Sequence, residues 1–152
     1  MNEELNKLIE KYRDSENYLI SSDEKCKQTV IYFSSHGIYE DDNIESFKKN
    51  IIEKNKFEFY GTRIKNSKNI FIRDITKDLY RKGINSSINS QKKLLDFLKK
   101  QVQNSVVRKI IFFDGFTLGK RRGKIIDREN QKCFFQIRKI LNNSVYAYFL
   151  SC

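Results

Sequence analysis

Residues 107–119 read VRKIIFFDGFTLG, and the fold that we expect follows from this stretch. The run IIFF at positions 110–113 is apolar and continuous, and it leads directly into Asp114 and a turn rich in glycine. A short continuous apolar run is typical of a strand inside a parallel sheet, because both faces of such a strand are covered. The stretch therefore predicts a central strand that ends at a sharp turn.

The turn after this strand has the pattern G-x-T-x-G, with Thr117 between Gly115 and Gly119. A strand that turns sharply into a helix needs small residues beside a nucleophile, and G-x-S-x-G is the turn known for this geometry. Thr117 replaces the serine of that pattern. The alternative is an ordinary loop with two glycines, because short glycine motifs also arise by chance. The spacing of a phosphate-binding P-loop is absent.

Two earlier stretches predict strands of the same buried kind. They are TVIYFSS at 29–35, which ends at His36, and NIFIR at 69–73, which ends at Asp74. Helical patterns lie between the strands, since apolar residues recur at helical spacing after a polar cap at 41–43 and again after Ser90. The order strand, helix, strand, helix, strand predicts an α/β domain of three layers with a mainly parallel sheet and a Rossmann-like order of elements.

Two further segments complete the expected organisation. Residues 2–14 have apolar side chains at helical spacing, so we interpret residues 1–27 as an N-terminal helical segment. Residues 57–61 predict either a short strand or a loop that packs aromatic rings. We expect one domain over residues 1–152, with a core at 28–119 and a divergent basic tail at 120–152, in which 145–150 can form a strand.

The carboxyl ends of the three predicted strands carry the candidate functional residues. Right-handed crossovers place these ends at one edge of the sheet, which is where open α/β sheets bind ligands. His36, Asp74 and the turn at 115–119 all stand at such ends. This convergence is the main functional inference from the residues alone.

The composition of the 152 residues narrows the class of protein. Hydrophobic residues make up 39% and charged residues 32%, as in folded proteins without long disordered segments. No apolar run is long enough to span a membrane, and the acidic start of the chain does not resemble a signal peptide. The three cysteines are widely spaced without a C-x-x-C pair, which favours reduced thiols in the cytoplasm. No motif predicts a cofactor.

The net charge of +11 is unevenly distributed. Residues 101–152 have ten basic and three acidic side chains, compared with 20 and 16 in residues 1–100. The run KRRGK at 120–124 stands out. It leaves open a non-catalytic binding domain that contacts an anionic polymer, nucleic acid included, or a protein partner. A sheet edge left open after 108–113 would also favour self-association.

With these residues in view, the chain resembles α/β-hydrolase-like proteins, in particular a bacterial group associated with surface-glycan synthesis and accessory secretion. The similar stretches are IYFSSHGIY at 31–39, FEFYGTRIKNSKNIFIRDI at 57–75, YRKGI at 80–84 and KIIFFDGFTLG at 109–119. The resemblance covers about residues 28–119, and its motifs have low specificity. It implies a first strand that ends in an oxyanion-type His-Gly turn at Gly37, a second that ends in Arg-Asp, and a third that carries the nucleophile turn.

The resemblance further implies an acyl or ester hydrolase, or an acyltransferase, acting on a small ester or a surface glycan. Thr117 is then the nucleophile, with Gly37, Gly115 and Gly119 shaping the turns that stabilise an oxyanion. The chain departs from the family in having a threonine and then a basic run where a serine and a small apolar helix are expected. Its single histidine also precedes the turn, so we expect the N-terminal half of such a domain, incomplete or inactive, followed by a divergent or frame-shifted end.

Each candidate residue has a structural alternative. Thr117 needs a base within hydrogen-bond reach to act as a nucleophile, and otherwise it is a loop threonine. His36 is a general base, a neighbour of the oxyanion site, or a strand-end histidine bonded to the backbone. Asp74, like Asp114, can orient His36 or bind Mg²⁺, but aspartates at strand ends more often cap the next turn.

Overall fold

The computed structural model describes residues 2–22, 26, 28–34, 36–103, 110–114 and 145–147. For His36, Gln103 and the last two ranges, it describes the backbone alone.

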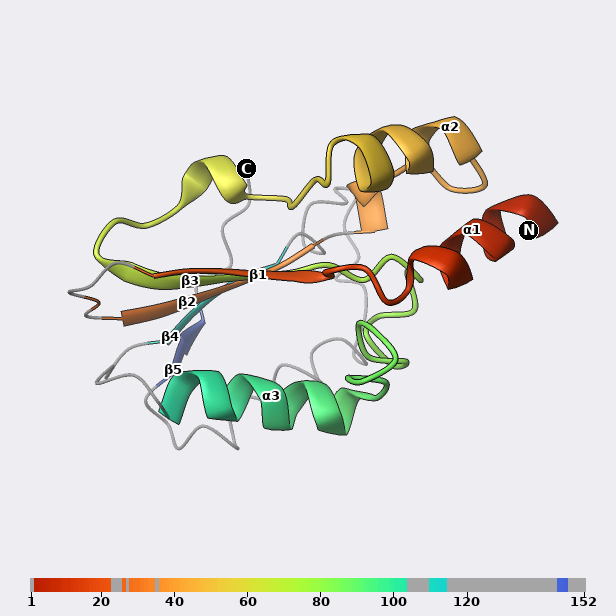
Figure 1. Ribbon diagram of the computed structural model, residues 1–152. Helices are drawn as coiled ribbons and strands as arrows, with labels where there is room; N and C mark the ends of the chain where they lie inside the picture. Colours follow the sequence, from red (N-terminus) through yellow and green to blue (C-terminus); the bar gives the residue numbers. More distant parts are fainter. Residues whose placement is uncertain are drawn as a thin grey trace, which may run out of the picture.

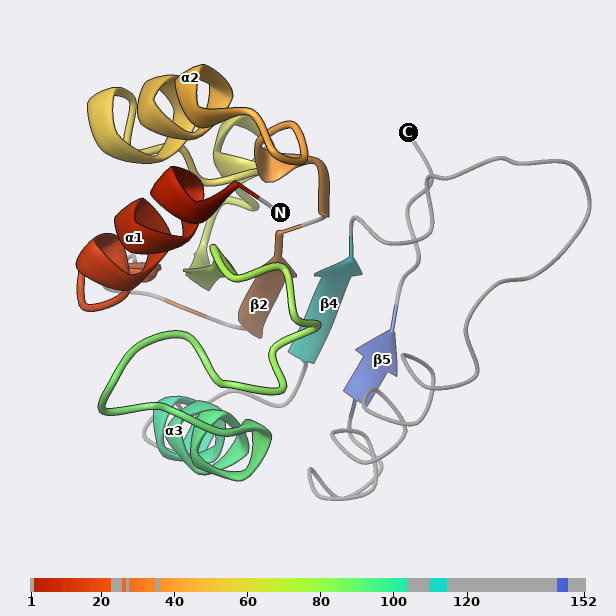
Figure 2. The same cartoon turned by 90° about the vertical axis from the view of Figure 1, so that its right-hand side faces the viewer.

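The centre of the fold is a five-stranded sheet in the order β1-β3-β2-β4-β5. The strands are β1 (Tyr18–Ser22), β2 (Gln28–Phe33), β3 (Ser67–Ile72), β4 (Ile110–Asp114) and β5 (Val145–Ala147). β2 is parallel to β3 on one side and to β4 on the other, and β5 is parallel to β4. Figure 2 shows the arrowheads of β2, β4 and β5 pointing the same way. The expectation of an α/β fold with a mainly parallel sheet is confirmed.

The strand order places a topological switch at β2. The chain passes from β2 to β3 on one side of it, and then to β4 and β5 on the other side. Doubly wound α/β sheets bind ligands at such a point, outside the carboxyl ends of the strands. The sheet order therefore indicates that a ligand site would lie at the carboxyl ends of β2, β3 and β4.

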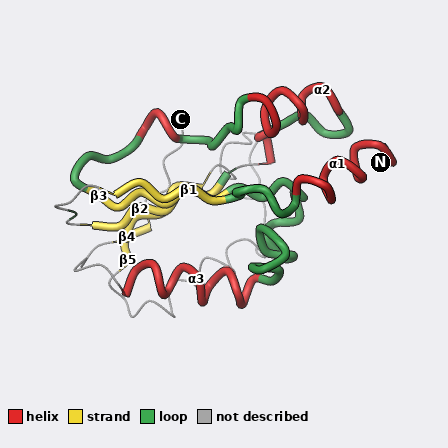
Figure 3. The backbone as a smooth tube through the Cα atoms, viewed as in Figure 1, coloured by secondary structure: helices red, strands yellow, loops and turns green. Residues whose placement is uncertain are grey.

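Helices and loops cover both faces of the sheet (Figures 1 and 3). α3 (Gln91–Gln103) lies on one face, and α2 (Ile44–Phe47), which continues into the π-helical η2 (Lys48–Glu53), lies toward the other with the short 3₁₀ turn η3 (Tyr60–Thr62). α1 (Glu3–Tyr12) lies near the end of the sheet to which β2 and β3 point, and contacts α2.

Three helices begin with a side-chain cap, and the caps at Asn43 and Ser90 are among those that the sequence predicts. The side chain of Asn2 accepts a hydrogen bond from the Glu4 amide, and the side chain of Asn43 accepts one from the Ser46 amide. Ser90 accepts one from the Lys93 amide at 3.3 Å. These bonds satisfy backbone N–H groups that a helix leaves without an intrahelical partner in its first turn.

The core follows the alternation of side chains along the strands. Ile31 and Phe33 of β2 pack with Ile70 and Ile72 of β3 in the cluster that contains Leu94 and Leu98 of α3. The residues of opposite parity belong to a second cluster, which includes Val30, Tyr32 and Phe71 and partly buried rings from residues 57–64. Both faces of β2 and β3 are thus apolar, which explains their continuous apolar runs.

Three features of the fold differ from the expectations or extend them. Residues 1–27 are not helical throughout, because residues 18–22 form β1, which pairs antiparallel with β3. Residues 57–59 form no strand; they pack aromatic rings against the sheet, as the second of the two alternatives predicts. β5 lies in the segment expected to be a divergent tail, and because it pairs with β4, that edge of β4 is not open.

The sequence pattern does not predict the antiparallel strand β1, and the reason is physical. It has five residues, four of them half-buried, so neither a continuous apolar run nor a clean alternation of apolar and polar residues marks it. Its place is set by pairing with β3, in which Tyr18 lies opposite Ile72 and Ser22 opposite Lys68. These pairs join residues far apart in the sequence.

Candidate functional site

The carboxyl ends of the three central strands lie side by side. Phe33, the last residue of β2, is in register with Ile72 of β3 and with Asp114 of β4. Neighbouring strands of a sheet are separated by about 4.8 Å, so the three chains leave the sheet within a short distance of one another. The edge that the sequence predicts therefore exists, and it is formed by the end of β2 with those of β3 and β4.

The structure places some of the predicted site residues at this edge. His36 and Gly37 form the start of the 3₁₀ turn η1 (His36–Ile38), shortly after β2, and Asp74 follows β3 by two residues. Gly115, Thr117 and Gly119 lie outside the described residues, as does the side chain of His36. The roles of these residues as nucleophile, base and oxyanion turn stay predictions.

The carboxylate of Asp74 organises the loop that follows β3. Its Oδ1 accepts hydrogen bonds from the Thr76 amide at 3.0 Å and the Thr76 hydroxyl at 2.6 Å, and its Oδ2 accepts one from the Tyr80 amide at 2.8 Å. The residue is buried. An ionised carboxylate has about four acceptor positions, so three bonds leave about one for any further partner. These bonds fit the predicted turn-capping alternative.

Ser34 and Tyr80 connect the ends of β2 and β3. The Tyr80 hydroxyl is 3.2 Å from the Ser34 hydroxyl and lies within hydrogen-bond distance of the carbonyls of Ser34 and Ile72. Ser34 Oγ also accepts a bond from the Asp74 amide at 3.2 Å. Both side chains are buried, and their bonds fix the spacing of the two loops that leave this edge.

The loop after β3 has an unusual backbone. Lys77, Leu79 and Tyr80 have positive φ angles of 53°, 53° and 59°. A left-handed conformation costs about 1 kcal/mol in a residue other than glycine, and it persists when surrounding contacts determine it. The bonds of Asp74 to both ends of this loop provide such contacts. Strain of this kind concentrates at ligand sites, so the loop marks this edge as a candidate functional region.

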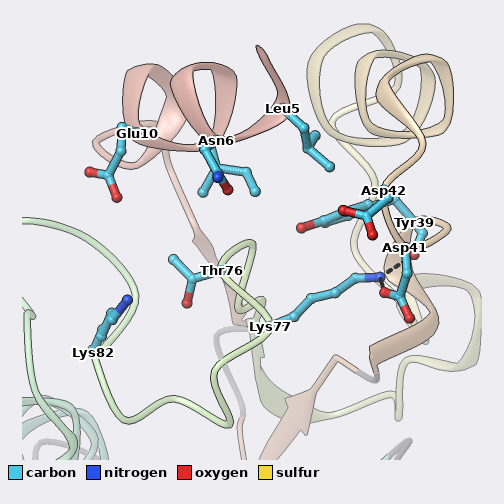
Figure 4. A pocket seen from close by; sticks show the side chains of 10 residues that line it. Leu5, Asn6, Glu10, Tyr39, Asp41, Asp42, Thr76, Lys77 and Lys82 are labelled. Atoms are coloured by element: carbon cyan, nitrogen blue, oxygen red, sulfur yellow. Dashed lines mark hydrogen bonds and ion pairs between the residues drawn. The ribbon is translucent and has the colours of Figure 1, made fainter. Parts of the chain in front are cut away.

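A cleft of about 640 Å³ lies at the same end of the molecule (Figure 4). One wall is α1, and the others are the loop after β2 and the loop after β3. Its lining combines apolar, acidic and basic side chains: Leu5, Asn6, Ile9, Glu10, Tyr39, Asp41, Asp42, Thr76, Lys77 and Lys82. The cleft is large enough for a small organic ligand, for which sites of this size are usual.

Lys77 crosses one side of the cleft, from the loop after β3 to the loop after β2 (Figure 4). Its ammonium group lies 2.5 Å from both the Tyr39 carbonyl oxygen and Asp41 Oδ1, and 4.0 Å from the centre of the Tyr39 ring. The Lys77 side chain is 10% exposed, whereas Asp41 is 84% exposed. The contact therefore joins the two loops across the mouth of the cleft, with the ammonium largely withdrawn from water.

Tyr39 contributes a fixed donor to this region. Burial raises the pKa of its hydroxyl well above the ordinary value, and the charges of Asp74 and Asp41 raise that pKa further. The hydroxyl donates a 2.8 Å hydrogen bond to the Ile75 carbonyl. Tyr39 is thus neutral over the physiological range and holds the loop after β3 in place.

Comparisons with protein-family models, with curated proteins and with solved structures find no match for this chain. The resemblance to α/β-hydrolase-like proteins therefore stays a prediction from the sequence. Two findings concern the described part of the chain. No helix there has both the length and the apolar character needed to cross a bilayer. No group of three or more histidine, cysteine or acidic side chains there is placed to hold a metal ion.

Sequence reasoning missed several residues of this edge. Ser34 and Tyr80 belong to stretches that the hydrolase resemblance includes, and Tyr39 follows the His-Gly turn closely, so position alone offered a weak signal for these three. No sequence pattern pointed to Lys77. Its left-handed backbone is not encoded locally, and its partner Asp41 lies 36 residues away in the chain.

Replacing Asp74 with asparagine is expected to destabilise the fold by about 2 kcal/mol, because the asparagine amide would present N–H groups to backbone N–H donors. Urea unfolding followed by circular dichroism measures the change. Asp78→Asn removes the same charge from the same loop, where no hydrogen bond joins the Asp78 side chain to another described residue, and we expect about 0.5 kcal/mol or less. Equal losses in the two variants would contradict the structural role of Asp74.

Proposed function

We propose that this chain is an α/β-hydrolase-like domain whose ester site is built at the carboxyl edge of the sheet. The observation that supports it best is the register of Phe33 with Ile72 and with Asp114, since it brings three strand ends to one edge. In the sequence, these three strands are followed by the His-Gly turn, by Asp74 and by the G-x-T-x-G turn. In this proposal the ancestral activity is acyl hydrolysis or acyl transfer on a small ester or a surface glycan.

In the proposed reaction, the residues that follow each of the three strands have a separate catalytic role. Thr117 supplies the hydroxyl that attacks the ester carbonyl, and His36 takes up its proton. The ester C–O bond then breaks, His36 gives the proton to the departing alcohol, and water or an acceptor hydroxyl removes the acyl group from Thr117. Backbone N–H groups of the glycine turns stabilise the negative charge that develops on the carbonyl oxygen. Asp74 orients the imidazole through the acceptor position that its loop bonds leave over.

Two features make this a slow catalyst or one that has lost turnover. The methyl group of Thr117 crowds a turn in which serine is the usual nucleophile. Asp74 already accepts three bonds from its own loop, so its capacity to orient a histidine is reduced. We therefore propose that the site keeps the arrangement of its catalytic residues although its activity is low or lost. The experiment below tests this arrangement directly.

Thr117→Cys replaces the weak nucleophile with a strong one at the same position. In a background in which the three native cysteines are serines, we expect this thiol to react with p-nitrophenyl acetate about ten-fold faster than the thiol of Thr62→Cys. A nearby base promotes the thiolate, and oxyanion donors stabilise the tetrahedral intermediate. Thr62 is an exposed residue of η3, so it provides the matched control. The released p-nitrophenolate is followed by absorbance.

The unmodified threonine gives the second measurement. Any hydrolysis of the ester by the native chain is expected to fall to the buffer rate in Thr117→Ala, with circular dichroism showing that the fold is kept. If the two introduced thiols react at the same rate, the 115–119 turn is an ordinary loop, and the proposed ester site is wrong.

A further inference from the structure

The face of the sheet opposite α3 carries an exposed aromatic ring that the proposed ester site does not use. Tyr60 in η3 is the large apolar side chain that the described part of the chain leaves exposed, at 43%. The guanidinium carbon of Arg63 lies 4.4 Å from the centre of its ring, and Arg63 donates a 3.0 Å hydrogen bond to the Tyr60 hydroxyl. The two side chains form an exposed cation–π pair.

This pair rests on a rigid base. The Tyr60 ring lies 5.4 Å from the buried ring of Phe71, which in turn stacks at 4.4 Å on the buried ring of Tyr32. Phe59, which precedes Tyr60, has a positive φ of 64°, a strained conformation for a bulky residue. The ring of Phe59 also stacks over Tyr32 at 6.5 Å. The platform is therefore formed before any ligand arrives.

The segment of chain that carries the platform is rich in basic residues. Residues 54–65 contain four basic side chains and one acidic side chain, and the basic ones are exposed: Lys54, Lys56, Arg63 and Lys65. None of these cations forms an ion pair with the residues that the structure describes. Exposed cations without acidic partners attract polyanions and release counterions when a polyanion binds.

A cleft of about 360 Å³ adjoins the platform. Arg63 and Lys65 line it together with Ser21, Gly61, Ile64 and Asn69. Two cations in a polar hollow suit a phosphate group. The cleft thus adds a position for a backbone phosphate beside a surface suited to stacking.

We propose that this aromatic and basic patch, formed by Lys54, Lys56, Tyr60, Arg63 and Lys65, binds single-stranded nucleic acid. A base stacks on the Tyr60–Arg63 platform, and the neighbouring phosphates contact Arg63, Lys65 and the lysines at 54 and 56. Stacking on an aromatic ring combined with a cationic track is the common mode of sequence-tolerant single-strand binding. A duplex fits this surface less well, because its bases are already stacked inside the helix.

The test is fluorescence anisotropy of a labelled oligothymidine titrated with the full chain at about 50 mM salt. Tyr60→Ala is expected to weaken binding about ten-fold, and Tyr60→Phe, which keeps the ring, to stay within about two-fold of the native chain. Arg63→Ala combined with Lys65→Ala is expected to lower the slope of log affinity against log salt by about 1. Lys92→Ala combined with Lys93→Ala removes two exposed charges on α3 and is the matched control.

Several outcomes would overturn the assignment. If the α3 control weakens binding as much as the Arg63 and Lys65 variant, the oligonucleotide is attracted by the net positive charge of the protein, and the patch is not a binding site. If neutralising residues 120–124 abolishes binding while the Tyr60 variant changes nothing, the nucleic acid binds the C-terminal third. Equal affinity for duplex DNA, effective competition by polyglutamate, or no binding by the native chain would also refute it.

Discussion

Gly83→Ala is expected to destabilise the fold by about 4 kcal/mol, a large fraction of the stability of a domain of this size. Gly83 has a φ of +70°, which disfavours any residue with a Cβ atom. A Cβ built there would overlap the Ile88 carbonyl oxygen and lie 2.6 Å from the carbonyl carbon and 2.7 Å from the Ser90 nitrogen. These atoms are backbone, so relief requires the loop before α3 to move.

The loop that would move is held by several bonds. The Ile84 amide donates to the Ile88 carbonyl at 2.8 Å, and the Ile84 carbonyl accepts a 2.8 Å bond from the Asn17 side chain. The same loop begins at Tyr80, which joins the ends of β2 and β3. A displacement at Gly83 therefore reaches both the α3 layer and the candidate site.

Gly61→Ala is the matched control for this prediction. Among the described residues, no atom outside its chain neighbours lies within 4 Å of a Cβ built at Gly61, and its φ is not positive, so we expect a change of about 0.5 kcal/mol or less. Urea unfolding of the two variants and the native chain, followed by circular dichroism, measures the difference. A Gly83→Ala protein as stable as the Gly61→Ala protein would show that the 83–88 loop is not closed as described.

Arg73→Met is expected to lower the free energy of unfolding by about 4 kcal/mol. Arg73 is 1% exposed, and its guanidinium donates to three oxygens: Asn17 Oδ1 at 2.9 Å, the Lys56 carbonyl at 3.2 Å and the Glu16 carbonyl at 3.2 Å. It also lies 4.6 Å from the centre of the Phe57 ring. The variant keeps most of the apolar stem and leaves these oxygens without their donor.

The charge of Arg73 opposes folding, and its hydrogen bonds offset that effect. Burial lowers the pKa of Arg73 to about 10, so the group is still protonated at neutral pH. Because its pKa is higher in the unfolded chain, the charge reduces stability at neutral pH, and this reduction eases only as the pH rises above about 10. The expected loss in Arg73→Met therefore measures the three bonds minus that penalty.

Two further variants make the Arg73 prediction specific. Arg73→Lys keeps the charge without the planar fork that reaches three acceptors, so we expect an intermediate loss of about 2 kcal/mol. Arg63→Ala removes an arginine that also lies over an aromatic ring but is exposed, and the expected loss is about 0.5 kcal/mol. If Arg73→Met and Arg63→Ala cost the same, Arg73 does not tie the three segments together.

Several elements could be predicted because their signals are local. The apolar runs at 29–35, 69–73 and 108–113 predict strands buried on both faces, and the structure places three parallel neighbours there. The polar residues Asn43 and Ser90 predict helix starts, and both accept the expected hydrogen bonds. Each of these signals depends on a few consecutive residues, so contacts with distant residues were not needed to predict these elements.

Other features required partners that the sequence does not reveal. In the sequence, Arg73 and Asp74 are adjacent opposite charges at the end of a strand. In the structure, the Arg73 side chain donates a hydrogen bond to Asn17, 56 residues earlier. The Asp74 amide donates one to Ser34, 40 residues earlier. Lys77 and Leu79 adopt left-handed conformations without being glycine or asparagine. In each case the surrounding fold determines the conformation against local preference.

The amino-acid sequence by itself determined the α/β class, the parallel alignment of the central strands and the edge at which their ends meet. It did so because a strand covered on both faces must be apolar throughout, and because crossovers have a fixed hand. Only the tertiary structure decided that β1 borders β3, that β5 borders β4, and which side chains meet in the cleft. Those choices depend on hydrogen bonds and packing between residues far apart in the chain, and no local pattern encodes them.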